Sequence, residues 1–469
     1  MRSDLSQATA VELVAAMTRR ELGVVELLES CLRTVARLNP RLNAFVTVAE
    51  ESARAAAKAC QSVLDRGEPA GLLHGLPFGV KDIIVTAGIR TTYGSPLYKD
   101  HVPTEDAEVV ARLKRAGAIV LGKTNTPEFA TGANTVNEVF GATRNPWNTE
   151  LSPAGSSGGS AVAVAAGMVP LAQGTDFGCS IRIPAAFCGI VGLRTTAGLI
   201  PNRPMHLPWD PGQVHGPMAR TAEDAALMLD AMIGLDPLWP ISVAPPWRSA
   251  LAEVQASAGA SGRRIAYAPD IAGFGVDAEV EAICRQAAVD LRQAGAQVDE
   301  IEFDAADGFD AYKTLRGQWM VGQQLQRMAM LPQFGPNLRG NVEAGLALTV
   351  ADTAAAEHAR ERVWARFRDL FERYDFLLTP AAPVLPYPVS ENYPAQIGGR
   401  RLDHYIDWIA PAFLVTLVGF PAGSVPAGKS ASGLPVGLQV VGRRFAEPGI
   451  LSLAKLVQSQ HPIGRPPVD

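Results

Sequence analysis

The order of apolar segments is the feature of this chain that most restricts its fold. Short apolar runs alternate with longer segments in which apolar residues recur three and four positions apart, as they do in helices. The short runs lie at 76–85, 118–121, 264–267, 297–303, 376–380, 412–418 and 435–441. The helical patterns lie at 9–20, 24–38, 49–66, 105–116, 160–169, 278–294 and 351–374. We expect Asn39-Pro40 to end the second helix. The alternation predicts an α/β fold with a mixed sheet.

The composition allows a large core and gives no sign of a charged polymer or a membrane as partner. Hydrophobic residues make up 47% of the 469 residues and charged residues 19%, which excludes a disordered chain. The net charge is −5 and no basic run stands out, so we expect neither nucleic acid nor an anionic membrane as partner. The polar start of the chain does not fit a signal peptide, and no 18-residue uncharged apolar stretch predicts a membrane span.

The cysteines favour a reducing compartment. Their odd number and irregular spacing indicate reduced thiols in the cytoplasm rather than a disulfide framework. No CxxC pair or HExxH helix suggests a metal site, and no cofactor is predicted. The five are Cys31, Cys60, Cys179, Cys188 and Cys284.

Two short patterns match known motifs without their structural context. Residues 117–124 fit the phosphate-binding pattern GxxxxGK[ST], but the four middle residues are typical of a strand, and Asn125-Thr126-Pro127 is a poor helix start. Residues 155–159 fit the GxSxG elbow of α/β-hydrolases. The preceding Ser152-Pro153-Ala154 does not form an apolar strand, and no downstream histidine is singled out. ATP binding and a histidine-based triad are therefore minor alternatives.

Two further segments carry residues suited to acid–base chemistry. Lys81 lies within an apolar run, where burial would lower its pKa and let it act as a base. Taken alone, it is more readily explained by pairing with Asp82 or by reaching solvent. The run 154–160 supplies hydroxyls and close backbone approach, but alone it fits a flexible loop or a helix cap.

The loop 174–184 has the composition of an anion-binding turn. Successive amides around its glycines can form a nest for an oxyanion, and Ser180 lies at the end of that nest. Asp176 and Arg182 could brace the loop as an ion pair.

Taken together, these segments resemble the amidase signature family, which includes fatty acid amide hydrolase and malonamidase. The resemblance is strongest over about residues 75–200, and the order of elements agrees along the whole length. Lys81 precedes Ser156 by 75 residues, and Ser156 precedes Ser180 by 24, which also fits. The resemblance implies a large, mixed, mostly parallel twisted sheet covered by helices on both faces. It rests on residues 79–82, 121–125, 141–147, 154–160, 174–184, 186–189 and 433–442.

The resemblance also implies a Ser-cis-Ser-Lys triad that cleaves a carboxylic amide through an acyl-enzyme. Ser180 would be the nucleophile, Ser156 the bridging serine in a cis peptide after Gly155, and Lys81 the base. The expected oxyanion donors are the amides of Phe177, Gly178, Cys179 and Ser180. Ala130, in the loop 130–132, is expected to face the substrate. The expected supporting residues are Gly155, Thr175, Asp176 and Arg182.

One residue departs from the family pattern. The family usually has Gly-Gly-Ser before the nucleophile, whereas this chain has Gly178-Cys179-Ser180. A cysteine side chain needs room and disfavours positive φ, although its amide can still donate. The Cys179 thiol could narrow the acyl pocket, make the enzyme sensitive to thiol reagents, or itself be the nucleophile.

Other functions remain open on the same fold. The main alternative is the glutaminase subunit of a tRNA-dependent amidotransferase, which usually carries a Ser-Arg-Tyr-Gly segment after a Gly-Leu-Lys-Pro-Thr stretch. Here the corresponding residues are 192–201 followed by 205–209, which favours a stand-alone amidase. An ester or carbamate hydrolase and a catalytically silent binding protein are further alternatives.

The sequence is least informative about the substrate. Phe177, Met205, His206 and Trp209 could line an apolar acyl pocket and 305–350 could form a variable wall, although core or loop packing explains each equally well. The expected partner is a small-molecule amide, and a homodimer stays open. We predict a single amidase domain over 1–469. Its parts are N-terminal helices (1–68), a core with the catalytic residues (69–235), a surface connection (236–262), a variable α/β part (263–375) and a C-terminal core segment (376–469).

Overall fold

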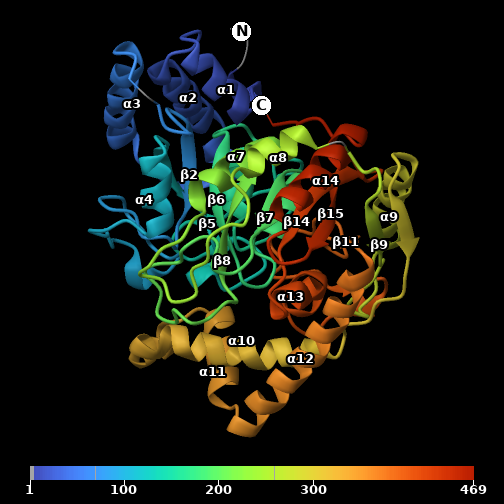
Figure 1. Cartoon of the computed structure of the whole chain (residues 1–469). Coiled ribbons are helices and arrows are strands. Elements are labelled where there is room, and N and C mark those ends of the chain that lie inside the picture. Colours follow the sequence, from blue (N-terminus) through green and yellow to red (C-terminus); the bar gives the residue numbers. More distant parts are fainter. Residues whose placement is uncertain (1–4, 69, 258, 469) are drawn as a thin grey trace.

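A single large sheet runs through the chain in the computed structural model, which describes residues 5–68, 70–257 and 259–468 (Figure 1). Two small hairpins, β4 (Val136–Asn137) with β5 (Gly141–Ala142) and β12 (Gln396–Ile397) with β13 (Arg400–Arg401), lie outside it. The eleven strands of the large sheet, in spatial order, are β1 (Phe45–Val48), β3 (Ile119–Thr124), β2 (Pro77–Lys81), β6 (Leu171–Asp176), β8 (Val214–Ala219), β7 (Val191–Arg194), β14 (Ala422–Lys429), β15 (Pro435–Gly442), β11 (Phe376–Pro380), β9 (Arg264–Tyr267) and β10 (Gln297–Glu300).

The sheet is mixed, with parallel strands in two blocks. Strand β2 pairs in parallel with β3 and β6, and β9 pairs in parallel with β10 and β11. Between these blocks, the pairs from β6 through β8, β7, β14 and β15 to β11 are antiparallel. The α/β class and the mixed sheet are confirmed. The predominance of parallel pairing holds within the two blocks and not between them.

Helices cover both faces of this sheet. The short 3₁₀ helices are η1 (Leu5–Gln7), η2 (Pro96–Tyr98), η3 (Glu128–Ala130), η4 (Leu325–Gln333) and η5 (Asp407–Ile409). The α-helices are α1 (Ala10–Thr18), α2 (Val24–Leu42), α3 (Glu50–Asp65), α4 (Glu108–Arg115), α5 (Gly158–Ala165), α6 (Arg182–Cys188), α7 (Ala222–Met232), α8 (Ala250–Ala256), α9 (Ala278–Gln293), α10 (Gly308–Gln324), α11 (Pro336–Leu346), α12 (Val350–Arg373), α13 (Ala410–Leu417) and α14 (Glu447–Gln460).

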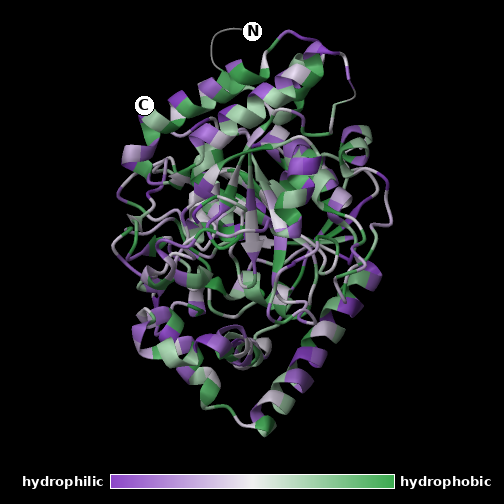
Figure 2. Ribbon diagram, turned by 90° about the vertical axis from the view of Figure 1, so that its left-hand side faces the viewer, coloured by the Kyte–Doolittle hydropathy of each residue, from purple (hydrophilic) through white to green (hydrophobic). Residues whose placement is uncertain are grey.

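The apolar core lies on the two faces because successive side chains of a strand point in opposite directions. In β11, Phe376 and Leu378 join a cluster with α2, α7 and α14, which we call the first core cluster. Leu377, between them, joins the second core cluster with α12 and α13. Figure 1 shows α10, α11 and α12 grouped at one end of the molecule. The outer helices carry both hydrophilic and hydrophobic residues, as expected for helices that bury one side (Figure 2).

The end of α2 differs from the prediction. The helix continues through Pro40 to Leu42 instead of ending at Asn39-Pro40. The Asn39 side chain accepts hydrogen bonds from the amides of Ala44 and Phe45, and Asn43 closes the helix with a left-handed φ of 49°. The helix therefore ends two residues beyond the proline, where the two asparagines cap its last turn.

Two structural facts concern disulfide bonds and membrane-spanning helices. The five cysteines are all free. In the described ranges, none of the helices combines the length and apolar character that crossing a bilayer needs.

Candidate active site

Lys81 stands at the carboxyl end of β2, between β3 and β6, and its side chain is buried. Its ammonium group donates hydrogen bonds to three hydroxyl oxygens, at 2.7 Å to Ser156 Oγ, 2.9 Å to Ser157 Oγ and 2.9 Å to Thr175 Oγ1. The strand therefore presents the lysine to two segments that are far apart in sequence, the serine-glycine run and the end of β6.

The surroundings of Lys81 favour its neutral form. Burial lowers its pKa to about 7, while the charge of Asp176 acts in the opposite direction. The adjacent carboxylate of Asp82 accepts from the amide and hydroxyl of Thr92, and the Lys81 side chain is 0% exposed. Pairing with Asp82 and reaching solvent, the two simpler explanations of this lysine, are therefore wrong.

The serine-glycine run enters α5 through a cis peptide between Gly155 and Ser156. The residue after it, Ser157, was not singled out by the sequence. Its amide donates to the Ser180 carbonyl at 3.0 Å, and its hydroxyl donates to the Thr175 carbonyl at 3.2 Å. Ser157 therefore joins Lys81 to the loop after β6. In the sequence, its position next to Ser156 could have pointed to this role.

Asp176 and Arg182 form a buried ion pair that closes this loop. Arg182 donates to the two Asp176 carboxylate oxygens at 2.8 and 3.1 Å, and Arg194 lies 3.6 Å from the same carboxylate. Burial alone would raise the pKa of Asp176, but the two guanidinium groups outweigh it and hold the pKa below its usual value. The Ile181 amide also donates to Asp176, so the carboxylate fixes the loop at both ends.

The peptide planes of the loop turn several amides away from the protein. The Gly178 carbonyl accepts from Arg182 at 2.8 Å, and the Phe177 carbonyl accepts from the Tyr312 hydroxyl at 3.2 Å. Since carbonyl and amide point in opposite directions across a trans peptide, the amides of Gly178 and Cys179 face away from these partners. Within the part of the chain that the structure describes, the amides of Gly178, Cys179 and Ser180 donate to no protein group. Three adjacent unpaired amides can bind an oxyanion.

Cys179 fits this loop without positive φ. The residue is 2% exposed, and its thiol donates to the Gly155 carbonyl at 3.4 Å. Burial raises the pKa of the thiol to about 12, so it is protonated at neutral pH. A buried, protonated thiol is a poor nucleophile and a poor target for thiol reagents.

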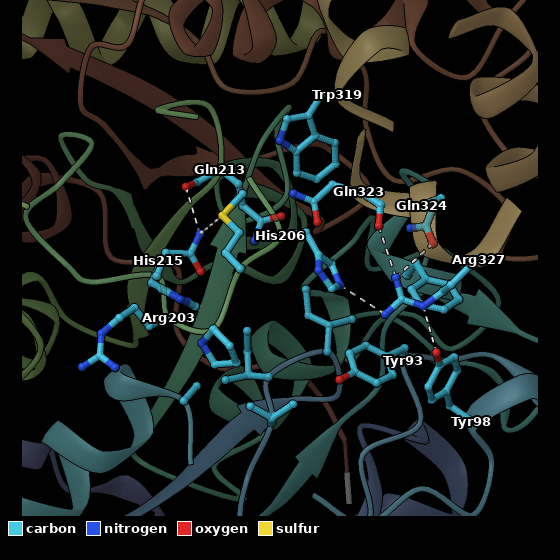
Figure 3. A pocket seen from close by; sticks show the side chains of 18 of the residues that line it. Tyr93, Tyr98, Arg203, His206, Gln213, His215, Trp319, Gln323, Gln324 and Arg327 are labelled. Atoms are coloured by element: carbon cyan, nitrogen blue, oxygen red, sulfur yellow. Dashed lines mark hydrogen bonds between the residues drawn. The ribbon is translucent and has the colours of Figure 1, made fainter. Parts of the chain in front are cut away.

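Two pockets with a shared wall lie in this region, and Ser180, which is partly exposed, lines the smaller one. A small one of about 30 Å³ is lined by Ser156, Ser180, Ala130, Phe177 and Arg316, among others. The larger one has a volume of about 430 Å³, and Figure 3 shows its lining from close by. Both pockets share four lining residues, which are Phe129, Gln213, Trp319 and Met320.

The structure shows which of the residues expected to line an acyl pocket do so. Phe177 lines the small pocket, and Met205 and His206 line the larger one. Trp209 belongs to neither lining and is 74% exposed, so that expectation is wrong. Helix α10, within the expected wall 305–350, supplies Trp319 and Met320 to both pockets.

Several lining residues of the larger pocket were not foreseen. Tyr93 stacks on Phe129 with ring centroids 5.5 Å apart. Arg327 lies over the Phe129 ring and over the Tyr98 ring, beside which Figure 3 shows it. These residues come from segments remote in sequence, so no local pattern indicates that they meet. In the described ranges, no group of three His, Cys, Asp or Glu side chains could hold a metal ion.

Comparisons with known proteins identify the family to which the chain is similar. The family model described as Amidase matches residues 26–451. The acylamidase of Rhodococcus erythropolis is 34% identical, with 98% of this chain and 96% of that protein covered. A glutamyl-tRNA(Gln) amidotransferase subunit of Methylococcus capsulatus is 35% identical, with 97% of each chain covered. The crystal structure of a bacterial aryl acylamidase, belonging to the amidase signature enzymes, superimposes with a TM-score of 0.90 at 28% identity and covers 97% of this chain and 96% of its own.

Proposed function

The chain belongs to the amidase family and is a hydrolytic amidase, and on that premise we propose that it cleaves carboxylic amides through an acyl-enzyme on Ser180. The observation that carries the proposal is the 2.7 Å hydrogen bond between Lys81 Nζ and Ser156 Oγ, in a buried site whose pocket also holds Ser180. A hydroxyl nucleophile needs a base to take its proton, and this arrangement supplies one without histidine.

In the proposed mechanism the proton moves along a relay. Neutral Lys81 takes a proton from the Ser156 hydroxyl, which takes one from Ser180 as Ser180 attacks the amide carbonyl. The proton then returns through Ser156 to the leaving amine, and water cleaves the acyl-enzyme by the same route. The lowered pKa of Lys81 supports this role, because a useful fraction of the lysine is neutral near pH 7.

The unpaired amides would stabilise the tetrahedral intermediate. The donors of Gly178 and Cys179 are held in place by the bonds of Tyr312 and Arg182 to the loop carbonyls, and the Ser180 donor by the bond of the Ile183 amide to the Cys179 carbonyl. Loss of one such donor typically costs about 3–4 kcal/mol of transition-state stabilisation. Thr175 and Ser157 would keep Lys81 aimed at Ser156.

For the substrate we propose a small-molecule amide whose bulkier part lies in the larger pocket. Aromatic rings of Tyr93, Tyr98, Phe129 and Trp319 line that space of about 430 Å³. Such walls suit a flat apolar group, and similarity to an aryl acylamidase points the same way. We also propose that the protein works in the cytoplasm.

A second candidate is the glutaminase subunit of a tRNA-dependent amidotransferase. It is favoured by relatives such as the protein of Methylococcus capsulatus, at 35% identity over nearly the whole chain. The two functions separate in one assay. Glutamine hydrolysis that appears only when partner subunits are added would select this candidate over the stand-alone amidase.

A covalent probe tests the nucleophile. We expect a fluorophosphonate to label Ser180 in the wild-type protein and to leave Ser180→Ala unlabelled, with the labelled peptide identified by mass spectrometry. Cys179→Ala serves as the matched control and should still be labelled. Absence of labelling in a folded wild-type sample, or labelling that persists in Ser180→Ala, would contradict the proposal.

A further inference from the structure

Arg316 is a buried cation in the small pocket that also holds Ser180. It projects from α10, its residue is 6% exposed, and its guanidinium carbon lies 5.7 Å from the centroid of the Phe177 ring. Arginine remains protonated at any pH that proteins tolerate, so this pocket contains a permanent positive charge.

The protein partners of Arg316 are all neutral. Its Nε donates to Asn341 Oδ1 at 3.0 Å, and its two Nη atoms donate to the Tyr405 hydroxyl at 2.9 Å and the Tyr312 hydroxyl at 3.4 Å. Among the described residues, no carboxylate forms an ion pair with it. Arg182, buried in the same region, instead binds Asp176.

A buried cation without an anion is costly unless something else compensates for it. Taking a charge out of water costs several kcal/mol, and neutral acceptors recover only part of this. The guanidinium group has five N–H donors, of which the protein engages three. Among the described residues, one N–H on each Nη atom therefore has no protein acceptor, and the two oxygens of a carboxylate can accept a pair of such donors.

We propose that Arg316 binds a carboxylate carried by the substrate, so that the preferred amides are anionic close to the scissile bond. This inference rests on the proposed function, because the anion subsite belongs to the same pocket as Ser180. Arg316 then determines specificity, and the reaction at Ser180 is unchanged.

A second cation, Arg327, borders the larger pocket but is less suited to this role. Its Nε donates to the Tyr98 hydroxyl at 2.8 Å, and its Nη2 lies 3.5 Å from His206 Nε2 (Figure 3). Arg327 is only half-buried, so water can solvate its charge without a bound anion. Arg316 lacks that solvation and lines the pocket of the nucleophile.

Turnover of two matched anilides tests the proposal. N-phenylsuccinamic acid and N-phenylbutanamide release the same aniline and have acyl chains of equal length, one ending in carboxylate and the other in methyl. We expect the wild type to prefer the anionic substrate in kcat/KM, and Arg316→Met to reduce that preference about thirtyfold or more. Arg316→Lys, which keeps the charge but not the fork, should restore part of it.

The controls separate substrate recognition from a structural role and from general charge effects. Lys313→Met removes an exposed charge from the same helix and should leave the substrate preference unchanged. An equal loss on both anilides in Arg316→Met would mean that Arg316 only supports the fold. If the preference for the anionic substrate changed in Arg327→Met but not in Arg316→Met, the anion-binding site would lie in the larger pocket. Either result overturns the proposal.

Protection of Ser180 gives a readout that needs no turnover. We expect succinate to slow fluorophosphonate labelling of the wild type more strongly than neutral succinamide, and to lose this advantage in Arg316→Met. If succinate protects Ser180 from labelling no better than succinamide does, the anion subsite alone is overturned. No labelling of Ser180 in the folded wild type overturns the proposed function as well.

Discussion

The protonation state of Lys81 determines the pH range in which the proposed relay can work. Its pKa is lowered to about 7 by burial, and only the neutral amine can accept a proton. Below that pH the lysine is charged and the relay is blocked; above it the base form predominates. We therefore expect kcat/KM to rise with pH through about 7 and then level off, as measured by initial rates over a pH series.

The variant Lys81→Met tests the same group. Loss of a general base typically lowers the rate by about 10²- to 10⁴-fold, and the rise through pH 7 should disappear with it. Lys58→Met, at an exposed position of α3, is the control and should keep the wild-type profile. A wild-type rate that does not change between about pH 6 and pH 8 would contradict the assignment of Lys81 as base.

The candidate site was predictable where its residues belong to a local pattern. Lys81, Ser156 and Ser180 stand in recognisable segments, and the structure brings these segments together at one end of β2 and β6. Arg316 could not be found in this way, because its significance lies in the absence of a carboxylate around it, which only the packing of α10 determines. The chemistry of Cys179 was equally hidden, since its burial could not be read from its neighbours.

At the scale of elements, periodic helices and several apolar strands were predictable, but three central strands were not, and the short apolar run 412–418 forms helix α13. Strand β9 and strand β11 begin and end where the apolar runs do, and α9 and α12 deviate by a single residue. Strands β7, β8 and β14 carry glycine, and β8 and β14 also proline, in place of a clear apolar pattern. A Cβ on Gly216 in β8 would lie 1.8 Å from the Leu193 carbonyl oxygen in β7. The close pairing of these strands therefore requires glycine, and glycine also weakens the apolar pattern by which a strand is predicted.

The contact between α5 and the backbone after β3 gives a prediction at this scale. A Cβ on Gly159 would lie 2.3 Å from the Asn125 nitrogen, which is rigid backbone. Gly159→Ala must therefore displace α5, and with it the Ser156 segment that precedes the helix. We expect a loss of about 1–3 kcal/mol in the free energy of unfolding, measured with denaturant, together with reduced activity.

Gly340→Ala is the matched control because the substitution is the same. Gly340 lies in α11 with open space around the added Cβ, and alanine is favoured over glycine inside a helix. It should leave activity unchanged and stabilise the protein by about 0.5–1 kcal/mol. Equal effects of the two substitutions would show that the close approach at Gly159 does not matter.

For the whole molecule, the two core clusters share the same strands. In β14, Val425 packs in the first cluster and Ala422 in the second, and in β15 Val440 and Val441 divide in the same way. Neither cluster can lose these strands without exposing the other. We therefore propose that the chain unfolds as one unit, in line with the expected single amidase domain.

Two native cysteines report on the clusters separately. Cys31 lies in the first cluster and Cys179 in the second, and burial raises the pKa of each thiol to about 12. Both thiols should be inert to iodoacetamide in the folded protein and react only on unfolding. We expect their alkylation, followed by mass spectrometry along a urea series, to share one midpoint. Cys60, which is only partly buried, provides the reference for reaction without global unfolding. If Cys179 reacted at lower urea than Cys31, the active-site cluster would open independently, and the shared strands would not couple the two faces.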